Sequence, residues 1–397
     1  MSKTPNYFLI SIVLALALLS GVAVYQSILM KQIISTQGKL AEQVGTLHSL
    51  AARDEKYRPL RIIRPGKRAE LYPAARTFRP EVDTLEAFRQ RIQEDIKTWI
   101  GLDEELLESK VEIRSLGKET LDSLGVVREE VEFSFAGNEL WSLSGYLLYP
   151  AQRTGRLPAI FCLNGHAGSA EGVAGLKEDY THSYGLSLAR AGFKVLTFDW
   201  CFEGKSRLTD SRGSQYSGHD SVFEYMKTSG RTGLALYMEN AFCALAALKA
   251  DPGVDPERIG ITGISRGGEL TVYFAALFAG DSQIAACYAS GAGYPFVYRR
   301  FGGGCKCTYV EKVVDNYEFS DLLVAICPIP CRIQLGLKDN ILGYGDNLEE
   351  IYKAARPLYT RLGLQQRFGL DFHDGKHEYN ASQAAAFFKE HLSGAGM

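Results

Sequence analysis

The sequence lacks an excess of charge of either sign. Lysine and arginine number 44, and aspartate and glutamate number 46, among 397 residues, so the formal net charge at pH 7 is -2. Nucleic-acid binding needs a strongly basic surface, and this balance argues against nucleic acid as a partner. The chain also lacks internal repeats and low-complexity linkers, which excludes repeat architectures. With 46% hydrophobic residues, it can bury one large core.

Cysteine is absent from the first part of the chain. All eight cysteines follow residue 160, at Cys162, Cys201, Cys243, Cys287, Cys305, Cys307, Cys327 and Cys331. An even number is compatible with disulfides outside the cytosol, whereas Cys162 and Cys201 lie in apolar runs where free buried thiols are commoner. Cys305 and Cys307 have the spacing of half a metal site, but no second pair with ligand-like spacing has a histidine nearby. We therefore expect no metal and no other cofactor.

One long apolar run lies near the N-terminus. Residues 7–30 read YFLISIVLALALLSGVAVYQSILM, carry no charge, and are long enough to cross a hydrocarbon layer of about 30 Å. The run predicts a transmembrane helix that acts as an uncleaved signal anchor. A cleaved signal peptide is the alternative, because Lys3 supplies a basic start, but the run exceeds the usual signal-peptide core and no clear A-x-A site follows.

The flanking charges bear on the orientation of this anchor. Lys3 and the α-amino group precede the run, and Lys31 and Lys39 follow it. The positive charges on its two sides are therefore nearly equal, and the positive-inside rule does not choose an orientation. A very short tail before a large C-terminal domain is typical of an anchor whose bulk is translocated. We therefore predict a single-pass membrane protein with residues 1–6 in the cytoplasm and the catalytic domain outside it.

The patterns divide the chain into a tail and anchor (residues 1–30), a stalk (31–83) and a core domain (84–397). Apolar residues alternate at spacings of four and three in the polar segment 31–55, which indicates a helical stalk with a weak tendency to form a homodimer. These residues are Leu40, Val44, Leu47 and Ala51. The core begins with an amphipathic helix in residues 84–100.

After this helix the hydrophobic period changes. Residues 126–135 and 140–150 alternate around Ala136-Gly137-Asn138, which predicts an antiparallel hairpin. Short apolar runs then alternate with helical segments such as residues 233–250 and 382–392. The runs are LPAIFCLNG, KVLTFDW, RIGITG, IAACYASG, CRIQLGLKD and QRFGLDFHD. This alternation predicts an α/β fold whose mainly parallel central sheet is covered by helices on both faces.

A serine lies between two glycines in GITGISRGGEL, residues 260–270. Gly263-x-Ser265-x-Gly267 follows the strand run RIGIT and precedes a predicted helix, which is the context of a nucleophile elbow. Glycines are needed because the tight strand-to-helix turn has no room for a Cβ beside a serine in strained backbone. The three-residue pattern is weak by itself, and a polar serine in a turn is the alternative.

Two later residues are candidate partners of this serine. Asp339 ends the run CRIQLGLKD, and His377 lies in HDGKHEYN after the run QRFGLDF. A serine hydroxyl attacks efficiently when a histidine takes its proton and a carboxylate orients that histidine. The order Ser265, Asp339, His377 is that of the α/β hydrolases, and it predicts a catalytic triad. Three other residues compete for the roles of acid and base: Asp199, Asp321 and His373.

The two histidines differ in their expected surroundings. His377 is expected in the loop beyond the final strand, where Gly375 would help the chain to turn back towards the elbow. His373 is expected within the strand or at its end. We therefore assign the base to His377.

The loop Leu163-Asn164-Gly165-His166-Ala167-Gly168 follows LPAIFC, where this fold places one half of an oxyanion hole. By position, the donors are the backbone N–H groups of His166 and Arg266. The prediction gives no role to the His166 ring, for which a surface position is the alternative. The Arg266 guanidinium is expected in solvent, although an acidic or sugar substrate is an alternative partner.

Together these motifs resemble the acetyl-xylan-esterase-like branch of the dienelactone hydrolase relatives within the α/β-hydrolase superfamily. The resemblance spans residues 88–392 and rests on TWIGL, LPAIFCLNGHAG, FDWCFEGKS, DPGVDPERIGITGISRGGEL, CKCTYV, GLKD and DGKHEYN. Asn164 stands where a histidine is usual, and ICPIP lacks the common arginine between its prolines. The Ser-Arg pair is also similar to that of glucuronoyl esterases, and Ser-x-Gly-Gly to that of prolyl-oligopeptidase-type peptidases, whose propeller repeats are absent here.

The triad predicts a serine hydrolase that cleaves carboxylic esters through an acyl-enzyme intermediate. The resemblance implies an acetylated sugar or a similar small ester as substrate, and the residues alone do not choose the acyl or alcohol part. Two alternatives stay open: a prolyl-oligopeptidase-like peptidase or amidase, and a catalytically silent binding protein with the same fold. A complete triad disfavours the silent protein, because a binding module needs no acid and base at these positions.

Overall fold

The computed structural model describes residues 74–138, 141–206, 208–209, 215–216, 226, 228–280, 284–293, 296, 305–339 and 348–392. The chain separates into two compact units, Met1–Ile62 and Ile63–Met397, and the described residues all belong to the second. The predicted anchor in residues 7–30 and the stalk helix in residues 31–55 lie outside the described ranges. None of the described helices has both the length and the apolar composition that a membrane span requires.

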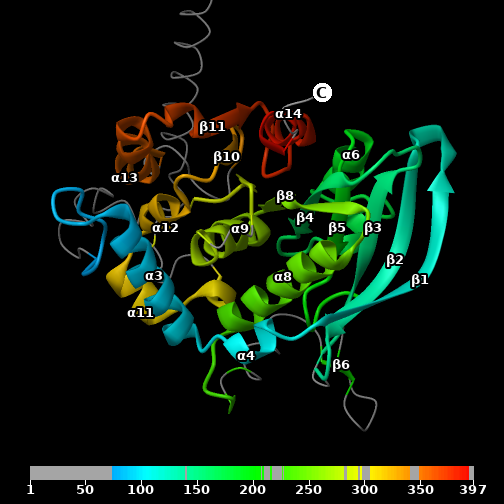
Figure 1. The fold of residues 1–397 in the computed structure, drawn as a ribbon, viewed down its shortest axis with the longest axis horizontal. Coiled ribbons are helices and arrows are strands. Elements are labelled where there is room, and N and C mark those ends of the chain that lie inside the picture. Colours follow the sequence, from blue (N-terminus) through cyan, green and yellow to red (C-terminus); the bar gives the residue numbers. More distant parts are fainter. Residues whose placement is uncertain are drawn as a thin grey trace, which may run out of the picture. The chain divides into compact units, whose positions relative to one another are not determined.

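A nine-stranded sheet forms the centre of the second unit, in the order β1-β2-β3-β5-β4-β8-β9-β10-β11 (Figure 1). Its strands are β1 (Val111–Leu121), β2 (Val126–Phe135), β3 (Leu143–Pro150), β4 (Leu157–Leu163), β5 (Lys194–Phe198), β8 (Val254–Ile264), β9 (Ala286–Ser290), β10 (Cys331–Gly336) and β11 (Phe368–His373). Pairing is antiparallel from β1 through β3 to β5, and parallel from β5 to β11. The predicted mainly parallel sheet is therefore confirmed.

The strands agree with the sequence patterns, with one exception. The six apolar runs form β4, β5, β8, β9, β10 and β11, and the predicted hairpin forms β2 and β3, with Val126 opposite Pro150. The patterns did not predict β1. This strand lies at the edge of the sheet, and all of its residues except the two at its ends are exposed. A strand with two exposed faces has no apolar alternation by which to recognise it.

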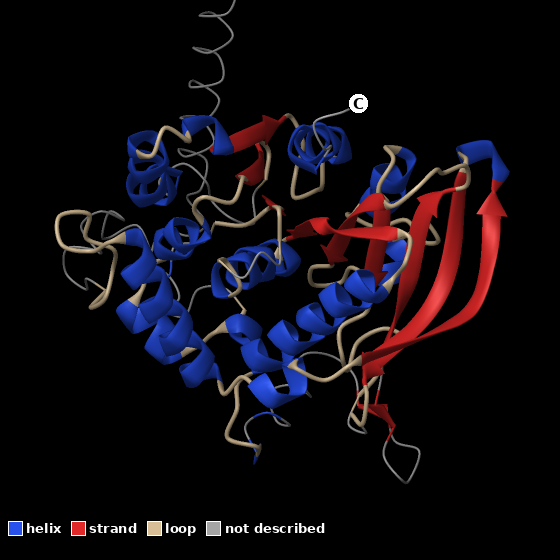
Figure 2. Cartoon of the chain, in the orientation of Figure 1, coloured by secondary structure: helices blue, strands red, loops and turns tan. Residues whose placement is uncertain are grey.

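Helices cover both faces of the sheet (Figures 1 and 2). One core cluster joins the sheet to α3 (Leu85–Ile100), α8 (Gly233–Ala250), α9 (Arg266–Leu277), α11 (Glu311–Asn316), α12 (Phe319–Ile326) and α13 (Leu348–Arg361). The other joins it to α5 (Ala170–Val173), α6 (Tyr184–Arg190) and α14 (Ala381–Leu392). Residues of β4 alternate between the two, since Phe161 belongs to the first cluster and Ile160 to the second.

The remaining described elements are short. They are α4 (Glu104–Leu107), β6 (Leu208–Thr209), β7 (Gln215–Tyr216) and the 3-10 helices η2 (Asp122–Leu124), η3 (Lys306–Thr308) and η5 (Gln365–Arg367). Of these, η3 bears on the functional site because it contains Cys307 and is capped by Cys305.

The helix α3 shows how the sequence sets the boundaries of an element. Its first turn is capped by Thr84, whose side chain accepts a hydrogen bond from the Ala87 N–H, and it ends at Gly101 with a φ of 71°. Its buried side chains include Phe88, Ile92, Ile96 and Ile100, at a spacing of four residues. The predicted amphipathic helix is confirmed.

All eight cysteines are described, and none of them forms a disulfide bond. Cys162 and Cys201 are buried, in agreement with their apolar surroundings in the sequence, and burial raises the pKa of both thiols. Cys305 is partly exposed, and the other seven cysteines are buried.

Candidate active site

Ser265 lies in the turn between β8 and α9. Its φ of 60° and ψ of -122° are strained for a residue with a side chain. The turn is held by a 2.9 Å hydrogen bond from the Ser265 N–H to the Ser290 carbonyl at the end of β9. A Cβ on Gly267 would lie 2.0 Å from the Leu163 carbonyl oxygen, and one on Gly263 would lie 2.5 Å from the backbone of Gly267. The two glycines thus permit the close packing that exposes the serine on a sharp turn.

His377 and Asp339 form a hydrogen-bonded pair. Nδ1 of His377 lies 2.5 Å from Oδ2 of Asp339, and their side chains are 10% and 1% exposed. His377 lies in the loop after β11, and Asp339 lies in the loop after β10. A carboxylate on Nδ1 leaves Nε2 as the nitrogen that can accept a proton.

Backbone contacts fix the two loops to each other. The Leu337 N–H donates to the His373 carbonyl and the Lys338 N–H donates to the Gly375 carbonyl, both at 2.8 Å. A Cβ on Gly336 would lie 2.1 Å from the Lys376 carbonyl oxygen. The acid and the histidine therefore keep their relative positions without depending on their own side-chain contact.

The histidine ring and the serine border the same space. A Cβ on Gly291 would lie 2.9 Å from Cε1 of His377 and 3.5 Å from the Ser265 nitrogen. Nε2 of His377 is buried and has no hydrogen-bond partner among the described residues. This nitrogen is thus open to a proton from Ser265 or from a bound molecule.

The rival acids have other partners. The Asp199 carboxylate accepts hydrogen bonds from the backbone N–H groups of Ala170 and Lys205, at 2.8 and 2.9 Å. Asp321 accepts the N–H groups of Phe78 and Glu318, both at 2.8 Å, and burial raises the pKa of its carboxyl to about 6. Both carboxylates hold backbone segments in place.

The rival base lies where the sequence predicts it. His373 is the last residue of β11 and stands opposite Gly336 of β10 in the parallel ladder. Burial lowers the pKa of its imidazole. The structure pairs Asp339 with His377, four residues further along the chain.

The loop after β4 packs directly on the serine turn. A Cβ on Gly165 would lie 2.6 Å from the Ile264 carbonyl oxygen and 2.9 Å from the Ser265 Cβ. Asn164 is buried, and its side-chain N–H donates to the Phe198 carbonyl at 3.0 Å. This residue therefore fixes the start of the loop, so that His166 follows beside the serine.

Tyr180 is a site residue that the sequence patterns did not single out. Its ring stacks on the His377 ring at 6.0 Å between centroids and an angle of 14°. Its hydroxyl is buried without a described partner, and a Cβ on Gly165 would lie 2.2 Å from it. A donor hydroxyl thus points towards the space beside Ser265, from a loop whose sequence carries no motif.

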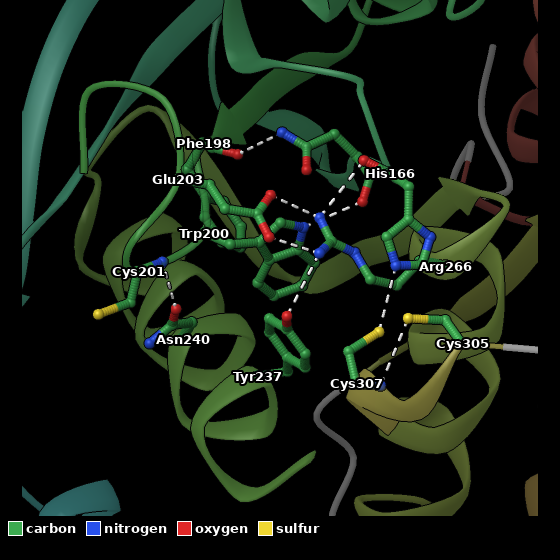
Figure 3. Close-up of polar contacts among 12 residues, drawn as sticks. His166, Phe198, Trp200, Cys201, Glu203, Tyr237, Asn240, Arg266, Cys305 and Cys307 are labelled. Carbon is green, nitrogen blue, oxygen red and sulfur yellow. Dashed lines mark hydrogen bonds and ion pairs between the residues drawn. The ribbon is translucent and has the colours of Figure 1, made fainter. Parts of the chain in front are cut away.

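The Arg266 side chain is buried, so the expectation that it lies in solvent was wrong. Its guanidinium donates to the Glu203 carboxylate at 2.5 and 2.7 Å, and to the Tyr237 hydroxyl and the Gly165 carbonyl at 3.3 Å (Figure 3). Its charge lies 5.8 Å from the Trp200 ring centroid and 5.2 Å from that of Tyr237. The side chain braces the serine turn against the β4 loop.

The ring of His166 also has a contact that the sequence did not reveal. Its Nε2 lies 3.2 Å from the sulfur of Cys307, and the Cys307 N–H donates to the sulfur of Cys305 at 3.5 Å (Figure 3). A hydrogen bond between the Cys305 and Cys307 side chains, and then one from His166, lower the pKa of the Cys305 thiol to about 3. The bond between the two cysteines also raises the pKa of the Cys307 thiol. No histidine lies near Cys305 and Cys307 in the sequence, but the fold brings His166 of the β4 loop to them.

Residues 143–295 match the dienelactone hydrolase family. This segment is therefore similar to that family, and the described sheet and helices have the arrangement of an α/β-hydrolase-like fold. The matched range includes Ser265 and the β4 loop, and ends before Asp339 and His377. YtaP of Bacillus subtilis (strain 168), a hydrolase by name, is 26% identical over 254 residues, which cover 59% of this chain and 80% of YtaP.

Solved structures of esterases share the fold of this chain. A Bacteroides fragilis NCTC 9343 protein described as an acetyl xylan esterase has a TM-score of 0.59 and 18% identity, over 77% of this chain and 81% of its own. A CE15 glucuronoyl esterase from Teredinibacter turnerae T7901 has a TM-score of 0.55 and 14% identity, over 78% of this chain and 86% of its own. At these identities the likeness concerns the fold.

Proposed function

We propose that this α/β hydrolase cleaves carboxylic esters with Ser265 as its nucleophile. The observation that carries the proposal is the position of Ser265 in a strained turn, in a space that it shares with the partnerless Nε2 of the Asp339-bound His377. Such a turn exposes the hydroxyl, and the buried pair supplies the base that a serine needs.

The first half of the proposed reaction acylates the serine. Oγ of Ser265 attacks the ester carbonyl carbon while Nε2 of His377 takes the hydroxyl proton, and Asp339 stabilises the resulting imidazolium. The oxyanion accepts hydrogen bonds from the backbone N–H groups of His166 and Arg266. The Ser265 N–H does not take this role, because it donates to the Ser290 carbonyl. When the carbon–oxygen bond of the leaving group breaks, His377 gives its proton to the departing alcohol.

The second half uses the same groups in reverse. A water molecule gives a proton to His377 and attacks the acyl carbon. The new oxyanion is held by the same two backbone donors. Its collapse breaks the bond to Ser265, which regains its proton from His377, and the carboxylic acid leaves.

We propose a small neutral acyl group, such as acetyl on a carbohydrate, as the substrate class. The guanidinium of Arg266, the cation beside the serine, is already paired with Glu203, so it is not open to a substrate carboxylate. The names of the structural neighbours, acetyl xylan esterase and glucuronoyl esterase, agree with an ester of a sugar.

A substrate panel tests this proposal. Acetylated oligosaccharides, simple aryl esters and prolyl-peptide amides are assayed side by side with the full chain, and a fluorophosphonate probe is followed by intact mass. We expect one phosphonyl adduct per chain and a higher kcat/KM for acetyl esters than for amides. Preferential cleavage of amides would favour a peptidase, and folded protein that takes no adduct would favour a binding protein.

We also propose that residues 7–30 form a membrane anchor, with residues 1–6 in the cytoplasm and the catalytic domain outside it. The stalk in residues 31–83 would form a weak homodimer. The length and the lack of charge of this apolar run support the anchor. Protease added to intact cells or spheroplasts should digest the catalytic domain. Full protection until lysis would show the opposite orientation or an unanchored protein.

A further inference from the structure

Three metal-ligating side chains meet beside the candidate active site. His166 belongs to the β4 loop, whereas Cys305 and Cys307 lie at the start of η3 and within it. His166 and Cys307 are 141 residues apart in the chain, yet their nitrogen and sulfur atoms are 3.2 Å apart. The ligand atoms of all three residues lie within 4.8 Å of one another, and Figure 3 shows them turned towards a common point.

These distances suit a tetrahedral zinc ion. Zinc bonds of about 2.3 Å to sulfur and 2.1 Å to nitrogen place the ligand atoms roughly 3.6 to 3.8 Å apart. The observed nitrogen–sulfur distance between His166 and Cys307 is about 0.4 Å shorter than this, and all three ligand atoms lie within 4.8 Å of one another. Small rotations of the three side chains would therefore bring their ligand atoms around one ion.

The donor set and its exposure also suit zinc. Two cysteine sulfurs and one imidazole are soft or borderline ligands, and they favour zinc over magnesium or calcium. Cys307 is buried, whereas His166 and Cys305 are partly exposed, so an ion can enter from solvent. A second pair of thiols, Cys287 and Cys331, faces across β9 and β10 but is wholly buried in the core.

We propose that His166, Cys305 and Cys307 form a Zn²⁺ site whose fourth position is taken by a solvent oxygen. The site goes beyond ester hydrolysis, since it lies on the imidazole side of His166 and supplies no group to the triad. It joins the β4 loop to η3. Zinc would thus hold in place the loop whose backbone N–H we assign to the oxyanion.

The test uses Co²⁺ as a spectroscopic probe and Zn²⁺ as its competitor. The full chain is kept in a phosphine reductant, stripped with a chelator, desalted and titrated with Co²⁺. We expect one Co²⁺ per chain, thiolate-to-cobalt charge-transfer absorption, tetrahedral ligand-field bands, and the loss of all three signals when Zn²⁺ is added. Zn²⁺ should also raise the Tm of the stripped protein.

Variants separate this site from the other thiols. Cys305→Ser, Cys307→Ser and His166→Ala should each lose the tetrahedral cobalt spectrum while retaining the circular dichroism of the folded protein. Cys287→Ala, which disrupts the other thiol pair, should keep one Co²⁺ per chain. His166→Ala keeps its backbone N–H, so loss of the spectrum in this variant reports on the imidazole.

Two results would overturn the proposal. One is folded, reduced wild-type protein that binds neither Co²⁺ nor Zn²⁺. The other is a Cys305→Ser/Cys307→Ser double variant that binds them as the wild type does. Either result leaves the proposed ester hydrolysis untouched, because that reaction is judged by substrate turnover and fluorophosphonate labelling.

Discussion

Ser265→Ala is expected to lower kcat for an aryl acetate by roughly 10⁴-fold or more, because a serine hydrolase without its nucleophile keeps only oxyanion stabilisation and binding. The same variant should take no fluorophosphonate adduct. Steady-state kinetics with the purified full chain and intact mass after labelling measure the two effects.

Two further variants serve as controls. Ser142→Ala removes a hydroxyl that bonds to Glu132, away from the candidate site, and should keep wild-type turnover and labelling. Ser265→Gly should be as inactive as Ser265→Ala yet about 1 kcal/mol more stable, because glycine removes the strain of a φ of 60°. Turnover that survives in Ser265→Ala, or an adduct mapped to another residue, would show that the nucleophile lies elsewhere.

His377→Ala should lower kcat by a similar factor, roughly 10⁴-fold, whereas His373→Ala should keep most of its ester turnover. His377 bonds to Asp339 and its Nε2 is open, while the backbone of His373 completes the β11 ladder whatever its side chain. Parallel kinetics on the two variants measure the difference.

The alanine at position 377 also removes the His377 hydrogen bond from the buried Asp339 carboxylate, which destabilises the folded state. His377→Gln is therefore made as a second variant, since its amide can donate to the carboxylate but cannot act as a base. Thermal melts show whether each variant is folded. The opposite ranking, with a folded His373→Ala inactive and a folded His377→Gln active, would reassign the base.

The buried pair of Arg266 and Glu203 explains how a strained serine turn stays in place. Arg266 follows the serine directly, and its side chain reaches Glu203 in the segment after β5 and Gly165 in the β4 loop. Its contacts therefore connect the backbone N–H assigned to the oxyanion with the loop that carries the second donor. The surrounding contacts offset the cost of the strained backbone.

Much of the fold was readable from the sequence because each buried strand and helix carries its own hydrophobic period. The runs from LPAIFCLNG to QRFGLDFHD became parallel strands, and α3 and α8 formed in the predicted residues. The strand β1 escaped prediction because both of its faces are exposed, so no local pattern marks it. Its place in the sheet follows from its pairing with β2.

The features of the candidate site also divide into those that the sequence predicts and those that only the tertiary structure reveals. The sequence by itself predicted Ser265, Asp339 and His377 as a triad, because a glycine-flanked turn and the ends of two late strands are local features. Tertiary structure alone decided that Arg266 is paired with Glu203, that Tyr180 lies on His377, and that His166 meets the Cys-x-Cys pair. These contacts join residues that are far apart in the chain, and their distances depend on how loops pack after the sheet has formed, which no local period encodes.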